Sequence, residues 1–99
     1  MDFQPREVIF SEGDKGDFVC FVTRGALDVV KKNEKGKDVV IATLGKGRSI
    51  GEMSIIDDFP RSATVRAKSQ TTLLILTRKK FEEMLEQHPQ IGVKLLNGD

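Results

Sequence analysis

The residues best suited to chemistry lie in one short stretch, from Gly51 to Ala63. Gly51 stands where a short helical turn is expected to begin, and a helix start leaves backbone N–H groups unpaired beside a partial positive charge. Both properties favour an anionic oxygen. Arg61 follows on a predicted tight turn, and its planar guanidinium matches the oxygens of a phosphate. This pairing predicts an anion site of the phosphate type.

Three neighbouring residues extend this predicted site, namely Glu52, Ser62 and Ala63. The backbone N–H groups of Ser62 and Ala63 can donate hydrogen bonds to the same anion. A phosphate would repel the carboxylate of Glu52, so a sugar hydroxyl is its better partner, as for acidic residues in other nucleotide sites. The stretch therefore predicts a phosphate binder next to a ribose binder.

Each of these residues also has an ordinary structural interpretation. Gly51 can be the glycine that a turn requires, and Glu52 an acid favoured by the dipole of a helix start. Arg61 can be a solvated turn arginine paired with Asp57 or Asp58. The structure separates these interpretations, because a binding arginine faces a cavity and a turn arginine faces solvent.

Charge and the scarcity of reactive side chains exclude or disfavour several function classes. Sixteen Lys and Arg against fifteen Asp and Glu leave a formal charge of +1, which argues against a nucleic-acid module held by bulk electrostatics. With Cys20 as the one cysteine, an intramolecular disulfide and a cysteine-based zinc site are excluded. With His88 as the one histidine, a metal-dependent barrel enzyme is disfavoured. We expect no catalytic residues, no metal and no enzyme activity.

The length and the hydrophobic pattern predict one small β domain. Ninety-nine residues suffice for a single globular unit. Segments rich in Val, Ile, Phe and Thr alternate with glycine-centred breaks, which is typical of an all-β sandwich or barrel. Strands are expected at 7–10, 18–23, 26–32, 38–44, 61–67 and 71–76. The apolar runs are far shorter than the ~18 residues of a membrane span, so we expect a cytoplasmic protein without one.

Helices are expected late in the chain. The stretch 51–56 reads as one helical turn, and Thr77 can cap a helix over 78–87 whose apolar face includes Phe81, Met84 and Leu85. The basic run 78–80 is expected to be a solvated helix start. A final helix is expected over 90–96.

Gly51-Glu52 followed by Pro60-Arg61-Ser62-Ala63-Thr64-Val65 resembles the phosphate-binding cassette of the cyclic nucleotide-binding domains. This family occurs in catabolite-activator-type regulators, kinase regulatory subunits and gated channels. The resemblance extends over 8–14, 21–25 and the late helix with His88-Pro89, so it covers the chain nearly end to end. It implies a mainly β fold with flanking helices: a jelly-roll-like β barrel of about eight strands, a short phosphate-cassette helix and C-terminal helices.

The resemblance also implies the domain boundaries. Residues 1–99 correspond to a single cyclic nucleotide-binding domain, without the leading helices that usually precede the barrel. The chain stops where the family's long C-terminal lid helix would be getting under way. We therefore expect the output segment to lie in an effector domain or a partner protein outside this chain.

Carried over onto this sequence, the resemblance assigns the contacts of the phosphate and the ribose. Gly51 and Glu52 become the partners of the ribose 2′-hydroxyl. Arg61 becomes the partner of the cyclic phosphate, helped by Ser62 and Ala63.

The resemblance further implies how the base is held and which nucleotide is preferred. Ile41 and Leu44 fall where the family lines the base and sugar with apolar side chains, and Val29 can join them. At the position of Ser62 the family often uses Thr for cyclic GMP and Ala or Ser for cyclic AMP. The expected ligand is therefore cyclic AMP rather than cyclic GMP, with no additional cofactor.

The predicted function is that of a ligand sensor without chemistry. Occupancy would move the C-terminal helices as Ile55 and Ile56 repack against them, because a ligand shifts an equilibrium only if it binds one arrangement better. No direct nucleic-acid contact is expected, and a homodimer is compatible with the sequence. The alternative is a degenerate barrel that serves only dimerisation or partner docking and binds no nucleotide.

Overall fold

A computed structural model of the chain describes residues 1–91, which form two four-stranded antiparallel sheets. The first sheet has the order β1-β8-β3-β6 and the second the order β2-β7-β4-β5. The strand bounds in the first sheet are β1 Asp2–Phe3, β8 Thr71–Thr77, β3 Phe18–Arg24 and β6 Ser49–Ile50. In the second sheet they are β2 Val8–Phe10, β7 Thr64–Ala67, β4 Ala26–Lys32 and β5 Asp38–Gly45.

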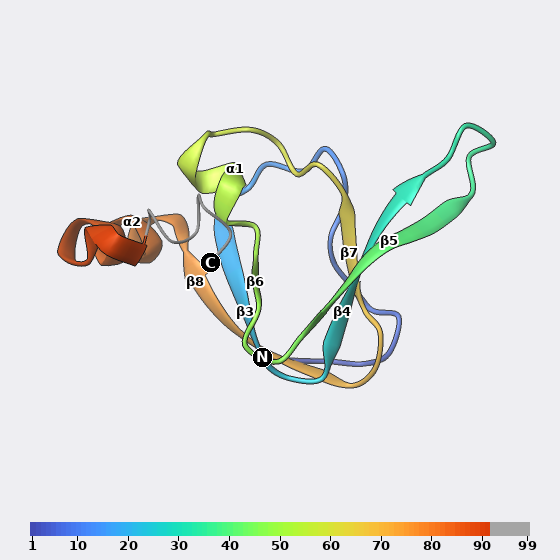
Figure 1. The fold of residues 1–99 in the computed structure, drawn as a ribbon, viewed down its shortest axis with the longest axis horizontal. Helices are drawn as coiled ribbons and strands as arrows, with labels where there is room; N and C mark the ends of the chain where they lie inside the picture. Colours follow the sequence, from blue (N-terminus) through green and yellow to red (C-terminus); the bar gives the residue numbers. More distant parts are fainter. Residues whose placement is uncertain (92–99) are drawn as a thin grey trace.

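The two sheets face one another as the two sides of an open wedge, and both helices lie at one end of the first sheet (Figure 1). Within residues 1–91 no ladder of hydrogen bonds joins the two sheets, so the barrel is not closed. The expected mainly β fold with eight strands is confirmed.

The hairpin of β4 and β5 is built by a turn that the sequence marks clearly. Asn33 accepts backbone hydrogen bonds on its side-chain oxygen from Lys35 and Lys37, and Gly36 has a φ of 75°. The strands then pair from Lys32 opposite Asp38 to Ala26 opposite Gly45. In Figure 1 this hairpin extends away from the first sheet.

Two apolar clusters hold the fold together. The first lies between the sheets and consists of Phe10, Cys20, Val22, Leu27, Val65 and Leu73. The second joins the first sheet to both helices and is centred on Val19, Ile55 and Phe81. Burial raises the pKa of the Cys20 thiol to about 11, so this cysteine is an unreactive core residue as expected.

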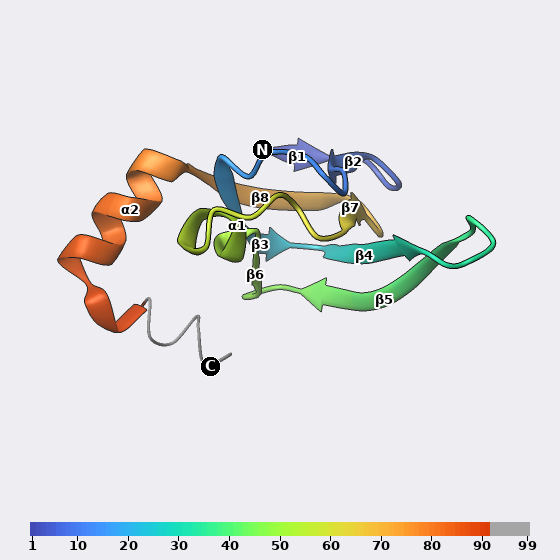
Figure 2. The same ribbon diagram turned by 90° about the horizontal axis from the view of Figure 1, so that it is seen from above.

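The helices begin and end close to the expected residues. Helix α1 spans Glu52–Ile56, and helix α2 spans Arg78–Gln87 with Thr77 accepting a 3.3 Å hydrogen bond from the Lys80 backbone. Figure 2 shows α2 continuing from the end of β8 on the side where α1 lies. No helix of residues 1–91 is long and apolar enough to cross a membrane. Most of the helix expected over 90–96 lies outside the described residues.

The structure corrects the strand predictions in two places. Strands β1 and β6 were not predicted, because two residues leave no alternating pattern to detect. The strand expected from residue 61 begins only at Thr64. The Arg61 backbone does not join a strand ladder. It forms two 2.8 Å hydrogen bonds with the loop between β2 and β3, accepting from Gly13 N–H and donating to the Asp14 carbonyl.

Replacing Phe81, whose side chain is fully buried between α2 and the first sheet, should cost the most stability. Phe81→Ala removes a ring from a packed cluster and is expected to lower the free energy of unfolding by about 3–5 kcal/mol. Leu74→Ala, at an exposed apolar position on β8, should change it by only about 0.5 kcal/mol. Urea unfolding of both variants measures the difference, and equal losses would show that the second cluster does not hold α2.

Candidate functional site

A cavity of about 160 Å³ opens at the end of the wedge where α1 lies. Most of the residues that the sequence predicted for the site line it: Val29, Gly51, Glu52, Arg61, Ser62 and Ala63. Helix α1 and the end of β6 provide one wall, while β2, β4, the stretch leading into β7 and β7 itself provide the others. The fold thus brings together residues that lie far apart in the sequence.

Two predicted residues do not line this cavity. Ile41 lies on β5 and is 56% exposed, and Leu44 packs half-buried against the first core cluster. Both belong to the strand next to β4, on which Val29 pairs with Ala42. Their contact with a nucleotide base stays a prediction.

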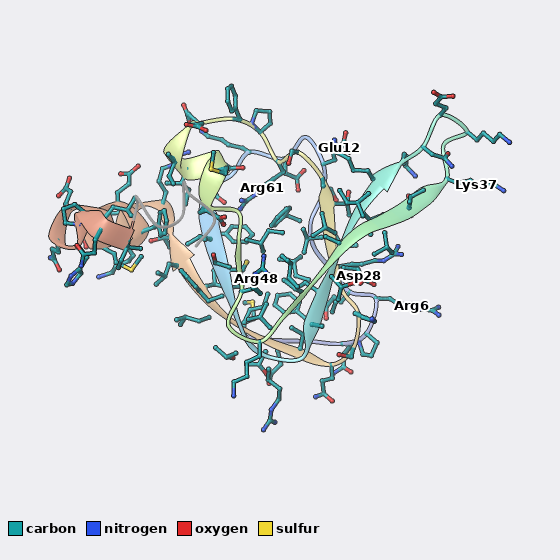
Figure 3. All side chains as sticks on the ribbon, viewed as in Figure 1. Arg6, Glu12, Asp28, Lys37, Arg48 and Arg61 are labelled. Atoms are coloured by element: carbon teal, nitrogen blue, oxygen red, sulfur yellow. The ribbon has the colours of Figure 1, made fainter. Side chains whose placement is uncertain are left out.

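Arg61 is a buried residue, with 3% of its surface exposed. Its guanidinium donates a 2.9 Å hydrogen bond to the Gly51 carbonyl and a 2.6 Å bond to the Phe18 carbonyl. It also lies 4.1 Å from the ring centroid of Phe10 and 4.7 Å from that of Phe18. Figure 3 shows Arg61 between the two sheets, beside α1. The interpretation as a solvated arginine paired with Asp57 or Asp58 is therefore wrong, and Asp58 pairs with Arg78 instead.

Among residues 1–91, two side-chain atoms of residues that line this cavity are buried without a hydrogen-bond partner: Nε of Arg61 and Oε2 of Glu52. An unpaired buried polar atom costs roughly 1–3 kcal/mol, so native structures seldom keep one without a reason. One atom is a donor on a cation and the other an acceptor on a carboxyl group. Together they suit a ligand that carries both an anionic oxygen and a hydroxyl group.

Burial shifts the pKa values of Glu52 and Arg61 toward their neutral forms. Removal from water raises the pKa of Glu52, although its own backbone hydrogen bond and the positive charges of Arg61 and Arg48 counteract the shift. Burial likewise lowers the pKa of Arg61. Glu52 and Arg61 attract one another but form no ion pair within 4 Å in residues 1–91.

Gly51 is required by the close approach of Arg61. Its φ is 96°, in the region that favours glycine, and a Cβ atom there would meet Nη1 of Arg61 and lie 3.2 Å from the Phe18 carbonyl oxygen. A turn glycine without a neighbouring group would show only the first property. The position therefore couples the start of α1 to the placement of the buried guanidinium.

Ser62 and Ala63 follow Arg61 at the cavity wall, Ser62 exposed and Ala63 nearly buried at 6% exposure. Sequence reasoning missed the aromatic support of the arginine, because Phe10 and Phe18 read simply as strand residues. It also expected the run 78–80 to be a solvated helix start, which is wrong for Arg78. That side chain lies 2.9 Å from Asp58 and is 30% exposed.

Comparing two glycines tests whether Gly51 is needed for more than its backbone angle. Gly51→Ala and Gly47→Ala both place an alanine at a φ near 90°, but a Cβ at residue 47 meets no atom within 4 Å. Both should lose about 1–2 kcal/mol of stability for the backbone strain. Gly51→Ala should lose about 1–3 kcal/mol more, because it displaces the Arg61 guanidinium. Urea unfolding measures both losses, and equal values would contradict the close approach.

Glu52→Gln tests the buried carboxyl group. Because the pKa of Glu52 is raised from its ordinary value of 4.5, the folded state binds this proton more tightly than the unfolded state. Its contribution to stability is thus present at low pH and is lost as pH rises through the folded pKa. Glutamine cannot ionise, so the variant should gain stability relative to the natural protein as the pH rises from the ordinary pKa of 4.5 through the raised pKa of the folded state. Unfolding free energies of both proteins measure this, and a pH-independent difference would contradict the burial.

The chain was compared with known families, curated proteins and solved structures. Residues 1–88 match the model of the cyclic nucleotide-binding domain family. A lysophospholipase NTE1 from Chaetomium globosum is 35% identical over 89 residues, covering 90% of this chain and 6% of that protein. The cAMP-activated global transcriptional regulator CRP of Salmonella typhimurium is 28% identical over 94 residues, covering 94% of this chain and 45% of the regulator.

Comparison with solved structures points to the same family as comparison of the sequences. The crystal structure of the Thermus thermophilus catabolite activator protein superposes with a TM-score of 0.90 at 29% identity, covering 98% of this chain and 46% of the other. The chain thus spans less than half the length of these relatives. With the family model matching residues 1–88, the chain belongs to the cyclic nucleotide-binding domain family.

Proposed function

We propose that this chain binds cyclic AMP, in preference to cyclic GMP, in the cavity between α1 and β7. The observation that carries this proposal is the pair of unsatisfied buried atoms, Nε of Arg61 and Oε2 of Glu52. A cyclic nucleotide has both complementary groups, since its phosphate oxygens accept hydrogen bonds and its ribose 2′-hydroxyl donates one. Binding would therefore satisfy two atoms that the protein alone leaves unpaired.

The phosphate would lie against Arg61. Nε has no hydrogen-bond partner within residues 1–91, and Ser62 and Ala63, whose backbone N–H groups would donate to the same anion, line the cavity. The other two guanidinium nitrogens already donate to the Gly51 and Phe18 carbonyls, which hold the plane of the group in place. Held by these two carbonyls, the guanidinium can move only together with the segments that carry them.

The ribose would lie against α1, where Glu52 accepts the 2′-hydroxyl proton, and the base would extend toward β4 and β5. Val29 already lines the cavity, whereas Ile41 presents an exposed apolar side chain on β5. A base stacked over these side chains would remove part of that apolar surface from water. Serine rather than threonine at residue 62 supports cyclic AMP as the preferred ligand, on the family resemblance described above.

Binding would regulate another activity rather than perform chemistry. The two curated relatives described above are much longer than this chain, and one is named as a cAMP-activated transcriptional regulator. We infer that the output resides in an effector domain or partner protein, in the cytoplasm, and that a homodimer is a compatible assembly. The competing function is a degenerate barrel used only for docking, which would leave both unpaired atoms without a purpose.

Calorimetric titration with cyclic AMP and cyclic GMP tests the proposal. We expect saturable one-to-one binding with a lower Kd for cyclic AMP. Loss of the Arg61 contact removes a charge-assisted hydrogen bond of roughly 1.5–3 kcal/mol, so Arg61→Ala should raise the Kd at least about tenfold. Arg61→Lys should also weaken binding because an ammonium lacks the fixed Nε donor, and Glu52→Gln should weaken it less than Arg61→Ala.

Arg24→Ala is the matched control, because Arg24 is an exposed arginine at the end of β3 and does not line the cavity. It should bind like the natural protein. No heat from either nucleotide at high concentration would favour the docking barrel. Binding that survives Arg61→Ala unchanged would place the nucleotide elsewhere.

A further inference from the structure

Arg78, the first residue of α2, connects three separate segments of the chain. Its Nη2 donates to the Gly16 carbonyl at 3.1 Å, the Ser54 carbonyl at 3.2 Å and the Asp58 carboxylate at 2.9 Å. Its Nη1 lies 3.4 Å from the Ile55 carbonyl. One side chain of α2 thus contacts the loop after β2, the end of α1 and the turn that follows α1.

The carbonyl contacts matter more than the ion pair. Asp58 is 81% exposed, and an ion pair with so exposed a partner contributes little. The Ser54 and Ile55 carbonyls belong to the last turn of α1, where carbonyl groups have no partner within the helix. The guanidinium fork supplies those partners, so α2 and α1 are linked by hydrogen bonds that a shift of either helix would break.

Two routes of contacts lead from Arg61 to Arg78, one from its guanidinium and one from its backbone. The first runs through α1: Arg61 donates to the Gly51 carbonyl at its start, and Arg78 donates to the Ser54 and Ile55 carbonyls at its end. The apolar core follows this route, because Ile55 packs in one cluster with Phe81 of α2.

The second route runs through the loop between β2 and β3. Gly13 and Asp14 exchange 2.8 Å backbone hydrogen bonds with Arg61, and the Asp17 carbonyl accepts a 2.8 Å bond from the Arg78 backbone. Gly16, between them, packs directly against Ser54, where an added Cβ atom would overlap the serine side chain. The loop is therefore held against both α1 and α2.

We propose that Arg78 is the positioning residue through which occupancy of the cavity reaches α2. This inference rests on the proposed function, and it adds the side chain that transmits the expected movement to α2. An anion that pulls on Arg61 shifts the start of α1 and the loop together, and both carry carbonyl groups that Arg78 holds. A ligand that favours one arrangement of these carbonyls thereby favours one position of α2.

Backbone amide NMR of the full chain during titration with cyclic AMP tests this inference. In the natural protein, saturation should shift the amide signals of the cassette, 51–63, and those of α2, Arg78–Gln87. In Arg78→Ala, the cassette signals should still shift and saturate, while the α2 shifts at saturation fall by about threefold or more. A residue that only stabilises the fold would lower the melting temperature and leave the ratio of the two shifts unchanged.

Lys79→Ala is the matched control, since Lys79 is an exposed cation in the same turn of α2. It should respond like the natural protein. Arg78→Lys retains the charge but not the planar fork, so it should also reduce the α2 shifts, and it serves if Arg78→Ala fails to fold.

The outcomes separate the two proposals. Cassette signals that shift with α2 shifts of natural size in both Arg78 variants would overturn the role of Arg78 and leave the proposed function standing. Cassette shifts without α2 shifts in the natural protein would overturn it as well. No saturable shift anywhere in the natural protein would contradict the proposed function and, with it, this inference.

Discussion

The buried guanidinium of Arg61 is the constraint on which this end of the structure depends. Arg61 is 3% exposed, and removing a cation from water costs free energy. The surrounding residues must therefore replace the hydrogen bonds and favourable electrostatic contacts that water would provide. The Gly51 and Phe18 carbonyls and the faces of two phenylalanine rings do so. The position of the guanidinium requires glycine at the start of α1. The loop after β2 forms hydrogen bonds with the Arg61 backbone.

The compensation is incomplete, and the incomplete part lies at the cavity. Within residues 1–91, Nε of Arg61 and Oε2 of Glu52 have no hydrogen-bond partner, while the other two guanidinium nitrogens each donate one hydrogen bond to a carbonyl. Stability and ligand binding have opposite requirements at Glu52, because a neutral side chain there would avoid the cost of a buried charge and would weaken the contact with the ligand. The fold holds a recognising group rigidly and leaves one donor and one acceptor for the ligand.

The parts of this account that sequence could predict are those with local or strongly patterned signals. Strands of seven or eight residues such as β4 and β5, the Thr77 cap and the cassette from Gly51 to Ala63 all belong to this group. The jelly-roll-like arrangement of eight strands followed from the family resemblance rather than from any periodicity, whereas the lack of a closed barrel in residues 1–91 was seen only in the structure. The two-residue strands β1 and β6 could not be predicted from the sequence, because they owe their conformation to the strands with which they pair.

The features that could not be predicted from the sequence depend on contacts between residues far apart in the chain. The stacking of Phe10 and Phe18 on Arg61 joins residues more than forty positions apart, and no spacing rule marks such a contact. Arg78 was misread because a basic run at a helix start is usually solvated, whereas here the end of α1 presents carbonyl groups to it. The placement of Ile41 outside the cavity likewise reflects the position of β5 at a sheet edge, which its sequence does not encode locally.

The most direct test of the central claim is the side-chain Nε–H resonance of Arg61, assigned by its disappearance in Arg61→Lys and followed by NMR during titration with cyclic AMP. If the unpaired Nε–H is the donor reserved for the phosphate, its resonance should move strongly downfield and saturate together with the cassette amides. A resonance that stays in place while the nucleotide saturates the protein would show that Arg61 serves only the fold, and would contradict this account of the site.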